Sequence, residues 1–497
     1  MANETTGPKK SIYYHMVRGS AWSMAMRWGI RAIGLISTLI LVRLLTPFDF
    51  GIAAMGGLAL GFVTIFADFN IGMIVIRKVD ATREDYDTGW TVRLIQSLFL
   101  ASLMLAAAPL AADYFETDLA RAVVMWFALT AAIGGLENIG IVKARKELDF
   151  ALEFRFVLYK RVFEFLFTVG FAFWLRDYWA LVFGPMSAAI LGVLISYRMH
   201  PYRPRLSLAK WREFLKFSIW LTLRNFSRYF NMRLHLLLVG RAESTAFFGI
   251  YNVAAGLAQI ATQEIGTPLA RGLYPNFAKL VDKPDELMRA FSHSLCALGL
   301  LCLPAGIGLA CVAELFVPVV YGAQWVDAVP FVKWLAVYSV LNVIFIHVYG
   351  GILVVTGHDR LATGLSYFRL AVGAPIIIAA LYWYGATAVP IATALVPAIL
   401  LLPYTLVLGR VLPFTLGDLV AALWRPVIAV AAMSLAVLAL DVPSLGPVLL
   451  LLAKIVLGGL VYVSCIVILW RLAGRPEGPE GYVINRGWQH MKRRLGR

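Results

Sequence analysis

Long apolar runs separated by short polar segments make up almost the whole chain. A membrane interior about 30 Å thick needs about 20 apolar residues per helix, and we place about 14 such runs in the sequence. Their expected ranges are 20–42, 51–73, 89–111, 119–141, 155–175, 178–197, 213–239, 245–268, 287–311, 328–355, 361–383, 386–409, 420–440 and 447–470. The pattern predicts an all-α polytopic membrane protein with about 14 transmembrane helices.

Basic residues alternate between successive connections. The connections after the second, fourth and sixth runs are basic and include Arg77, Lys143 and Arg203, whereas acids such as Asp113 and Glu314 follow odd-numbered runs. Lys and Arg accumulate on the cytoplasmic side. We therefore expect a multi-pass protein of the bacterial cytoplasmic (inner) membrane with both termini in the cytoplasm. The N-terminal segment lacks the short apolar run and cleavage site of a signal peptide.

The composition narrows the function classes. With 60% hydrophobic and 15% charged residues in 497, a water-soluble fold is excluded. Topology and anionic lipid headgroups explain the net charge of +16, so no nucleic-acid partner is expected. No phosphate-binding loop, dinucleotide motif or metalloprotease motif is present, and no polar segment could hold a catalytic domain. We expect no catalytic residues, no metal site and no cofactor.

The chain aligns with itself at a shift of 198 residues. The matches are Ser20 with Ser218, Trp22 with Trp220, Arg43 with Arg241, Thr46 with Ser244, and Phe50–Ile52 with Phe248–Ile250. Thr46 and Ser244 can each cap a helix, and Asp49 has the spacing of a capping-box carboxylate. These features at one offset indicate an internal repeat.

The repeat spans six helices, so both copies have the same orientation in the membrane. This predicts two six-helix bundles related by a pseudo-two-fold axis along the membrane normal, with two extra C-terminal helices. The expected domains are a cytoplasmic segment 1–19, bundles 20–200 and 201–410, helices 13 and 14 in 411–470, and a basic tail 471–497.

The sequence resembles a known transporter family. An Arg-bearing first helix, the junction "RLLTPFDFGIAAM", the opening "WREFLKFSIWLTL" of the seventh helix and the turn "GHDRLATG" carry the likeness. They are similar to polysaccharide transporter (Wzx-type, colanic-acid-exporter-like) oligosaccharide flippases, in the superfamily of MATE drug exporters and lipid II flippases. The resemblance implies two bundles around a central cavity, and alternating access that moves a polyprenyl-diphosphate-linked sugar unit outward.

Cationic residues form stripes inside two of the apolar runs. The stripe of the seventh run, at spacings that share one helix face, consists of Arg224, Arg228, Asn231 and His235. The stripe of the first run consists of Arg27, Arg31, Gly34 and Thr38. Arg233 lies off the stripe. An arginine at the centre of an isolated membrane helix costs roughly 2.5–3.5 kcal/mol, so these positions need an explanation.

Three interpretations of the stripes stay open. Arg27 and Arg31 can extend to the lipid headgroups, and Arg224 and Arg228 can pair with an acid on a neighbouring helix. The functional interpretation is that the guanidinium groups face a water-filled cavity and bind the carrier's diphosphate. On this hypothesis the substrate-binding residues are Arg27, Arg31, Arg224, Arg228, Asn231, His235 and Arg369.

Two carboxylates are candidates for coupling transport to an ion gradient. Asp68 and Glu264 lie at similar depth in the two repeats, and proton or sodium coupling would need such a group. Structural pairing with the arginines is the alternative. Four further charged residues near helix ends are interpreted as interfacial, namely Glu137, Lys160, Arg161 and Glu164.

The leading hypothesis is a flippase for lipid-linked oligosaccharides in surface or exopolysaccharide biosynthesis. Its expected partners are the polyprenyl diphosphate carrier, membrane lipids, and a polymerase and glycosyltransferases of the same pathway, and we expect a monomer. The alternatives are a MATE-like drug or cation exporter, which the excess of intramembrane Arg disfavours, and a membrane-embedded polysaccharide polymerase, which the short outer loops disfavour.

Overall fold

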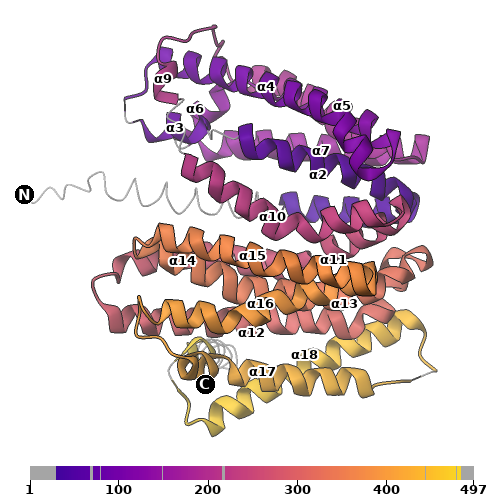
Figure 1. Ribbon diagram of the computed structural model, residues 1–497, viewed down its shortest axis with the longest axis vertical. Helices are drawn as coiled ribbons and strands as arrows, with labels where there is room; N and C mark the ends of the chain where they lie inside the picture. The colour runs from indigo at the N-terminus through magenta and orange to yellow at the C-terminus, as the bar shows by residue number, and fades with distance from the viewer. Residues whose placement is uncertain are drawn as a thin grey trace, which may run out of the picture. The chain divides into compact units, whose positions relative to one another are not determined.

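The computed structural model describes residues 29–67, 71–78, 80–147, 149–214, 219–442, 444–476 and 478–482. Within these ranges the regular structure is helical and no strand is present. The chain divides into two compact units (Figure 1). The first unit comprises the described residues up to Tyr229 together with Ser244–Gly249. The second unit comprises Phe230–Glu243 and the described residues from Ile250 onward.

The first unit contains long helices and a few short ones. After a helix over residues 29–44, its helices are α2 Pro47–Ala67, α3 Ile71–Arg77, α4 Arg83–Phe115, α5 Asp118–Gly135, α6 Gly140–Lys146, α7 Phe150–Leu175, α8 Trp179–Met199 and α9 Trp211–Phe214. Helix α4 packs along α5, and α7 packs along α8. Figure 1 shows the short helices α3, α6 and α9 gathered at one end of this unit.

The second unit repeats this order and adds two helices. Its helices are α10 Ile219–Ala242 and α11 Thr245–Lys279, which both begin in the first unit, α12 Pro284–Phe316, α13 Val329–Leu341, α14 Val348–Val355, α15 Asp359–Tyr384, α16 Val389–Leu408, α17 Leu416–Ala439 and α18 Pro447–Leu472. Short π and 3-10 segments cover Val317–Tyr321, Ala323–Ala328, Asn342–His347 and Ala386–Ala388. Helix α12 packs against α13, α17 and α18, around buried side chains such as Val312, Met433 and Leu451.

Ten described helical segments are long and apolar enough to cross a membrane. This confirms the predicted all-α polytopic class. Helices also overlap the other four predicted spans, namely residues 29–44, α7, α10 and α11. Helix α10 carries Arg224, Arg228 and Arg233, more charge than a span that faces lipid normally contains. The total of 14 spans stays a prediction.

The spacing of helix starts follows the sequence repeat. Pro47 and Thr245, which begin α2 and α11, are 198 residues apart, and Phe150 and Asp359, which begin α7 and α15, are 209 apart. The second unit therefore repeats the helix order of the first, with about ten residues inserted along the way. The domain boundaries expected at residues 200 and 410, and the axis relating the two bundles, stay predictions.

Hydrogen bonds confirm both predicted helix caps. The backbone N–H of Asp49 donates to Thr46 Oγ1 at 3.4 Å, and the N–H of Thr46 donates to the Asp49 carboxylate at 2.8 Å. This is a complete capping box at the start of α2. At the start of α11, the N–H of Phe247 donates to Ser244 Oγ at 3.3 Å. Each cap satisfies a backbone donor that has no partner within its helix.

The repeated glycines Gly51 and Gly249 permit a close crossing of α2 and the first turn of α11. A Cβ placed on Gly51 would lie 2.0 Å from the carbonyl oxygen of Thr245, and one on Gly249 would lie 1.8 Å from that of Pro47. A backbone oxygen cannot move aside as a flexible side chain can. Both positions therefore require glycine, and the two contacts are reciprocal.

Candidate functional site

The arginine stripe of α10 is exposed at one end and buried at the other. Arg224 and Arg228 are exposed, and neither forms an ion pair with any residue that the structure describes. The structure does not describe the side chains of the two acids that could pair with these arginines, Asp68 and Glu264. Asp68 lies outside the described residues, and Glu264 belongs to α11 without a described side chain. The two arginines thus present their charge with no described carboxylate to neutralise it.

Farther along α10, the polar side chains are occupied by protein partners. Asn231 Nδ2 donates to the backbone oxygen of Ser366 on α15 at 2.8 Å. His235 is buried, and its Nδ1 lies 2.9 Å from the hydroxyl oxygen of Tyr251 on α11. These two residues therefore connect α10 to its neighbours within the second unit. Their predicted contact with substrate stays a prediction.

Arg369 occupies a buried position on α15. Its Nη1 donates to Asn342 Oδ1 at 2.9 Å, and its Nη2 donates to the Tyr338 hydroxyl at 3.2 Å. The guanidinium carbon lies 6.0 Å from the Tyr338 ring centroid, within cation–π range. No acidic side chain among the described residues pairs with it. Arg369 is therefore a buried cation held by neutral oxygens and an aromatic face.

The cavity beside Arg369 is small. It measures about 20 Å³, and Asn231, His235 and Thr393 also line it. A space of this size holds about one water molecule. In this conformation, then, Arg369 has no room for a diphosphate, and binding there would require α10, α15 and α16 to separate.

The corresponding place in the first unit holds a cation paired with an acid. Lys160 on α7 contacts Glu137, just after α5, and Arg93 Nη2 on α4 lies 2.8 Å from the same carboxylate. Lys160 and Arg369 are 209 residues apart, the same spacing as the starts of α7 and α15. The sequence predicts an interfacial position for Glu137, but the structure shows it buried between two cations. Its helix-end position gave no signal of that burial.

The first predicted stripe also faces the fifth long helix of its unit. A Cβ on Gly34 would lie 3.1 Å from Arg161 Nη2 on α7, and Arg161 pairs with Glu164 at 2.9 Å. Arg31, one turn from Gly34, is half-buried, while Arg27 lies outside the described residues. Thus the stripe that continues from Arg31 contacts a charged pair interpreted from sequence as interfacial.

An apolar groove in the second unit was not predicted. It has a volume of about 450 Å³ and runs between α11, α12, α17 and α18. Gly308, Gly458 and Gly459 line it together with larger apolar side chains, and Lys454 is its charged member. Small residues on these helices leave the groove open. The sequence signal was the Gly458–Gly459 pair in an otherwise bulky apolar run, in helices interpreted only as additions to the bundle.

The fold and the charged residues inside it are those of one class of membrane protein. Two helical units in repeated order, with membrane-length helices and buried cations, are the architecture of a polytopic transporter-like membrane protein. Residues 40–330 match the family model described as "Polysaccharide biosynthesis protein". This match covers more than half of the chain, and the chain belongs to that family.

Curated relatives and a solved structure agree with this assignment. An "Uncharacterized membrane protein in cps region" of Klebsiella pneumoniae is 24% identical over 466 residues, which cover 92% of this chain and 96% of the relative. The "Lipopolysaccharide biosynthesis protein WzxC" of Escherichia coli (strain K12) is 24% identical over 423 residues, covering 84% and 85%. The lipid II flippase MurJ, in an inward closed conformation, superposes with a TM-score of 0.71 at 14% identity, covering 92% of this chain and 100% of MurJ. The chain thus has the MurJ fold and is a multi-pass inner-membrane protein.

Proposed function

We propose that this protein flips polyprenyl-diphosphate-linked oligosaccharide units across the inner membrane for surface or exopolysaccharide biosynthesis. Its family and its MurJ fold support this function. So does the name of the relative WzxC, which acts in lipopolysaccharide biosynthesis. The bundles would expose the substrate site alternately to the two sides of the membrane. We propose further that the protein acts as a carrier rather than as an enzyme, and that both termini are cytoplasmic.

The observation that carries the proposal is the exposed arginine pair Arg224 and Arg228 on α10. A guanidinium group offers forked donors that suit the oxygens of a diphosphate. Two such groups one helical turn apart can bind neighbouring phosphates of one ligand. Because no described acid neutralises them, their charge is available to an anion. Arg31 and Arg369 would contribute further positive potential. Arg27 is proposed as a substrate-binding residue from its position in the sequence alone.

The apolar groove suits the other end of such a substrate. A polyprenyl chain is long and apolar, and a groove lined by α17 and α18 side chains can shelter part of it. We therefore propose that the C-terminal helices hold the carrier chain. Sugar hydroxyls would then bind elsewhere, with Asn231 and His235 as candidates once their present hydrogen bonds open.

The test is replacement of Arg224 or Arg228 with alanine in the full-length protein. Polymer export should fall at least tenfold while membrane insertion is retained, because a phosphate contact made by a charged donor contributes roughly 1.5–3 kcal/mol. Surface polymer and unflipped lipid-linked units on the inner face are the two readouts. Arg233→Ala is the matched control, since Arg233 is exposed on the same helix but lies off the stripe. Full export by both single variants contradicts the proposal.

Two alternatives are separated by further measurements. A MATE-like drug exporter would change drug sensitivity when deleted and leave the polymer intact. If the protein were a membrane-embedded polymerase, its deletion would leave flipped but unpolymerised units on the outer face, rather than units trapped on the inner face. The predicted coupling residues Asp68 and Glu264 are tested by Asp68→Asn and Glu264→Gln in vesicles with imposed proton or sodium gradients, and transport that ignores both gradients rules out coupling.

A further inference from the structure

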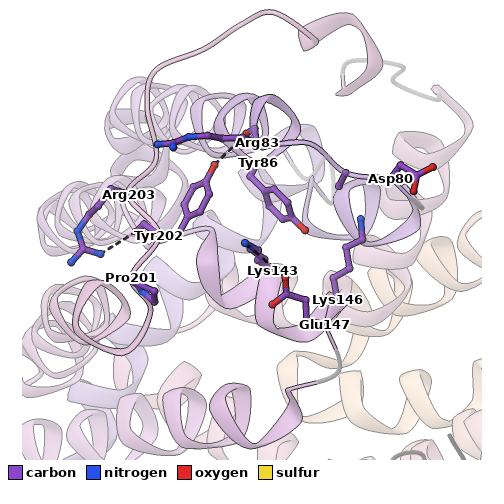
Figure 2. Close-up of a pocket in the computed structure, with 10 residues that line it drawn as sticks. Asp80, Arg83, Tyr86, Lys143, Lys146, Glu147, Pro201, Tyr202 and Arg203 are labelled. Atoms are coloured by element: carbon purple, nitrogen blue, oxygen red, sulfur yellow. Dashed lines mark hydrogen bonds and ion pairs between the residues drawn. The ribbon is translucent and has the colours of Figure 1, made fainter. Parts of the chain in front are cut away.

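Three connections of the first unit converge on one basic pocket. The connections before α4, around α6 and after α8 contribute Arg83, Tyr86, Lys143, Lys146, Tyr202 and Arg203 to a cavity of about 780 Å³ (Figure 2). We call this cavity the basic tyrosine pocket. The Lys and Arg content of all three connections predicts that they lie on the cytoplasmic side. The structure adds that residues about 60 to 120 positions apart in sequence surround a single space.

Two tyrosine rings form the wall of the pocket. The rings of Tyr86 and Tyr202 have centroids 5.9 Å apart, and the Lys143 Nζ lies 5.9 Å from each centroid. Lys146 Nζ lies 6.0 Å from the Tyr86 centroid, and the Arg83 guanidinium lies 6.0 Å from that of Tyr202. The Tyr202 hydroxyl donates to Asp87 at 2.8 Å, which fixes its ring. The cations are thus arranged around a rigid aromatic surface.

The pocket cations are held by carbonyl groups and by long ion pairs rather than by tight ion pairs. Lys146 donates to the backbone oxygen of Lys78, and Arg203 donates to those of His200 and Tyr202. These carbonyl groups orient the charges but carry no charge of their own. The nearest acids are loose partners, with 3.8 Å between Lys143 and Glu147 and 3.7 Å between Arg83 and Asp87. Four cations line the pocket against two acids, Asp80 and Glu147.

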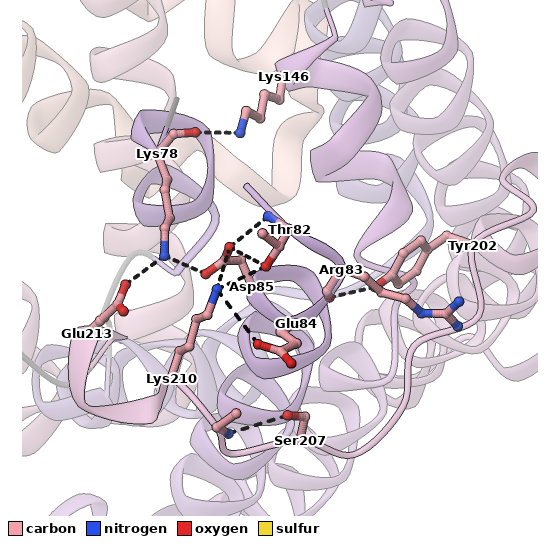
Figure 3. Close-up of polar contacts among 11 residues, drawn as sticks. Lys78, Thr82, Arg83, Glu84, Asp85, Lys146, Tyr202, Ser207, Lys210 and Glu213 are labelled. Carbon is pink, nitrogen blue, oxygen red and sulfur yellow. Dashed lines mark hydrogen bonds and ion pairs between the residues drawn. The ribbon is translucent and has the colours of Figure 1, made fainter. Parts of the chain in front are cut away.

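An adjacent cluster shows what neutralised cations look like in the same unit. Lys78 Nζ lies 2.6 Å from Asp85 and 2.9 Å from Glu213, and Lys210 Nζ lies 3.1 Å from Asp85 (Figure 3). The hydrogen bonds to Asp85 and Glu213 hold the pKa of Lys78 above its ordinary value. This cluster fastens α9 to the start of α4. Among the described residues the basic tyrosine pocket has no such tight pair, so its charge is open to an external anion.

We propose that the basic tyrosine pocket binds the phosphate group of an anionic membrane lipid. Lys and Arg beside the membrane surface attract such headgroups, and tyrosines are enriched at that depth. The pocket lies at the end of α4, a membrane-length helix, where a lipid headgroup can reach it. The phosphate could belong to a phospholipid or to a polyprenyl diphosphate. This inference does not depend on the proposed transport function.

Binding of short-chain probes to the purified full-length protein tests the proposal. The probes are dihexanoyl phosphatidylglycerol, farnesyl diphosphate, inorganic pyrophosphate and, as the uncharged-headgroup reference, dihexanoyl phosphatidylcholine, measured by titration calorimetry in neutral detergent. Each surface cation contributes about fivefold to the affinity for an anionic lipid. The variant Arg83→Gln/Lys143→Gln/Lys146→Gln should therefore bind the anionic lipid probes at least about twentyfold more weakly.

Two controls keep the result interpretable. Arg155→Gln removes an exposed cation of α7 outside the pocket and should leave the affinity unchanged. Lys143→Arg/Lys146→Arg keeps the charge and should retain binding within about threefold, even if the triple variant fails to fold. Binding should also persist in Arg224→Ala/Arg228→Ala protein, so a failed transport role and a failed pocket are distinguishable.

The probe that binds most tightly identifies the source of the phosphate. Preference for phosphatidylglycerol assigns the pocket to phospholipid, and preference for farnesyl diphosphate assigns it to the carrier. Pyrophosphate affinity equal to that of farnesyl diphosphate would show a soluble phosphate site and overturn the lipid assignment. Equal binding of all lipid probes, or unchanged binding in both the triple variant and its single-site component Lys143→Gln, would overturn the proposal altogether.

Discussion

The two units place a cation at the same point of the repeat but give it different partners. In the first unit, Lys160 on α7 and Arg93 on α4 share the carboxylate of Glu137. In the second unit, Arg369 on α15 bonds to the amide oxygen of Asn342 and the hydroxyl of Tyr338. Glu137 follows α5, and Asn342 follows α13 as the first residue of the π segment Asn342–His347.

The difference separates a structural use of charge from an electrostatic one. A buried acid between two cations compensates most of their charge and joins three helices. A buried arginine with neutral partners keeps its charge and raises the local positive potential, and this uncompensated charge lowers stability. We infer that the first unit provides rigidity at this position, whereas the second provides attraction for an anion.

The largest expected effect comes from removing the acid of the first unit. Glu137→Ala should lower the free energy of unfolding by about 3 kcal/mol, because it leaves Lys160 and Arg93 without their carboxylate. The value lies at the low end for buried pairs since both cations are about one-third exposed. Asn342→Ala, the matched variant of the second unit, should cost only about 1–2 kcal/mol. Unfolding in detergent measures both, and equal losses would abolish the proposed distinction.

The repeated glycines provide a position where the two copies should behave alike. Gly51→Ala and Gly249→Ala should each destabilise by about 2–3 kcal/mol, since each adds a Cβ against a backbone oxygen. Gly57→Ala, also on α2, is the control. Its Cβ would meet nothing within 4 Å, and alanine should stabilise the helix by roughly 0.5–1 kcal/mol. Melting temperatures of the three variants check this, and a tolerated Gly249→Ala would disprove the reciprocity.

Converting the second unit to the charge pattern of the first tests function directly. Asn342→Asp places a carboxylate beside Arg369 and should leave the melting temperature unchanged or higher, because the new pair forms a charge-assisted hydrogen bond. Export should nevertheless fall at least about tenfold, since the free positive charge is lost. Asn342→Ala serves as the control that keeps the charge. Full export by Asn342→Asp would mean that the charge of Arg369 is not used.

The smallest effect concerns a carboxyl group that only the first unit has. Burial and the neighbouring Asp49 carboxylate raise the pKa of Asp177, between α7 and α8, whereas the corresponding turn Ala386–Ala388 has no acid. A folded-state pKa above the unfolded value means that stability is present at low pH and is lost as pH rises through the folded pKa. Asp177→Asn should therefore melt slightly higher than the wild type at pH 8, and this difference should vanish below pH 4. A pH-independent difference would contradict the assignment.

Hydropathy and repeat matching predicted the helical framework well for a physical reason. Membrane helices must be apolar over a fixed length, so a short stretch of sequence is enough to locate each one. The caps at Thr46 and Ser244 were also predictable, because the donor and acceptor are three residues apart. Helices α7 and α10 do not meet the apolar criterion because charged side chains interrupt their apolar runs.

Contacts between side chains on different helices could not be predicted from hydropathy or from the repeat. The spacing of Arg224, Arg228, Asn231 and His235 correctly marks one helix face, but it cannot tell which members meet another helix. Asn231 and His235 do so through Ser366 and Tyr251, whereas the arginines stay exposed. The burial of Glu137 and the convergence of three loops on the basic tyrosine pocket likewise depend on tertiary packing, for which a single sequence carries no direct signal.

The arginines of α10 also bear on how the chain enters the membrane during synthesis. A segment with Arg224, Arg228 and Arg233 near its middle is a weak signal for the insertion machinery. The insertion of a helix with one central arginine costs roughly 2.5–3.5 kcal/mol of free energy. The strongly apolar helix that follows α10 and α11 is α12, which begins at Pro284. On the prediction that α10 spans the membrane, we expect its insertion to depend on later parts of the chain, beginning with α12.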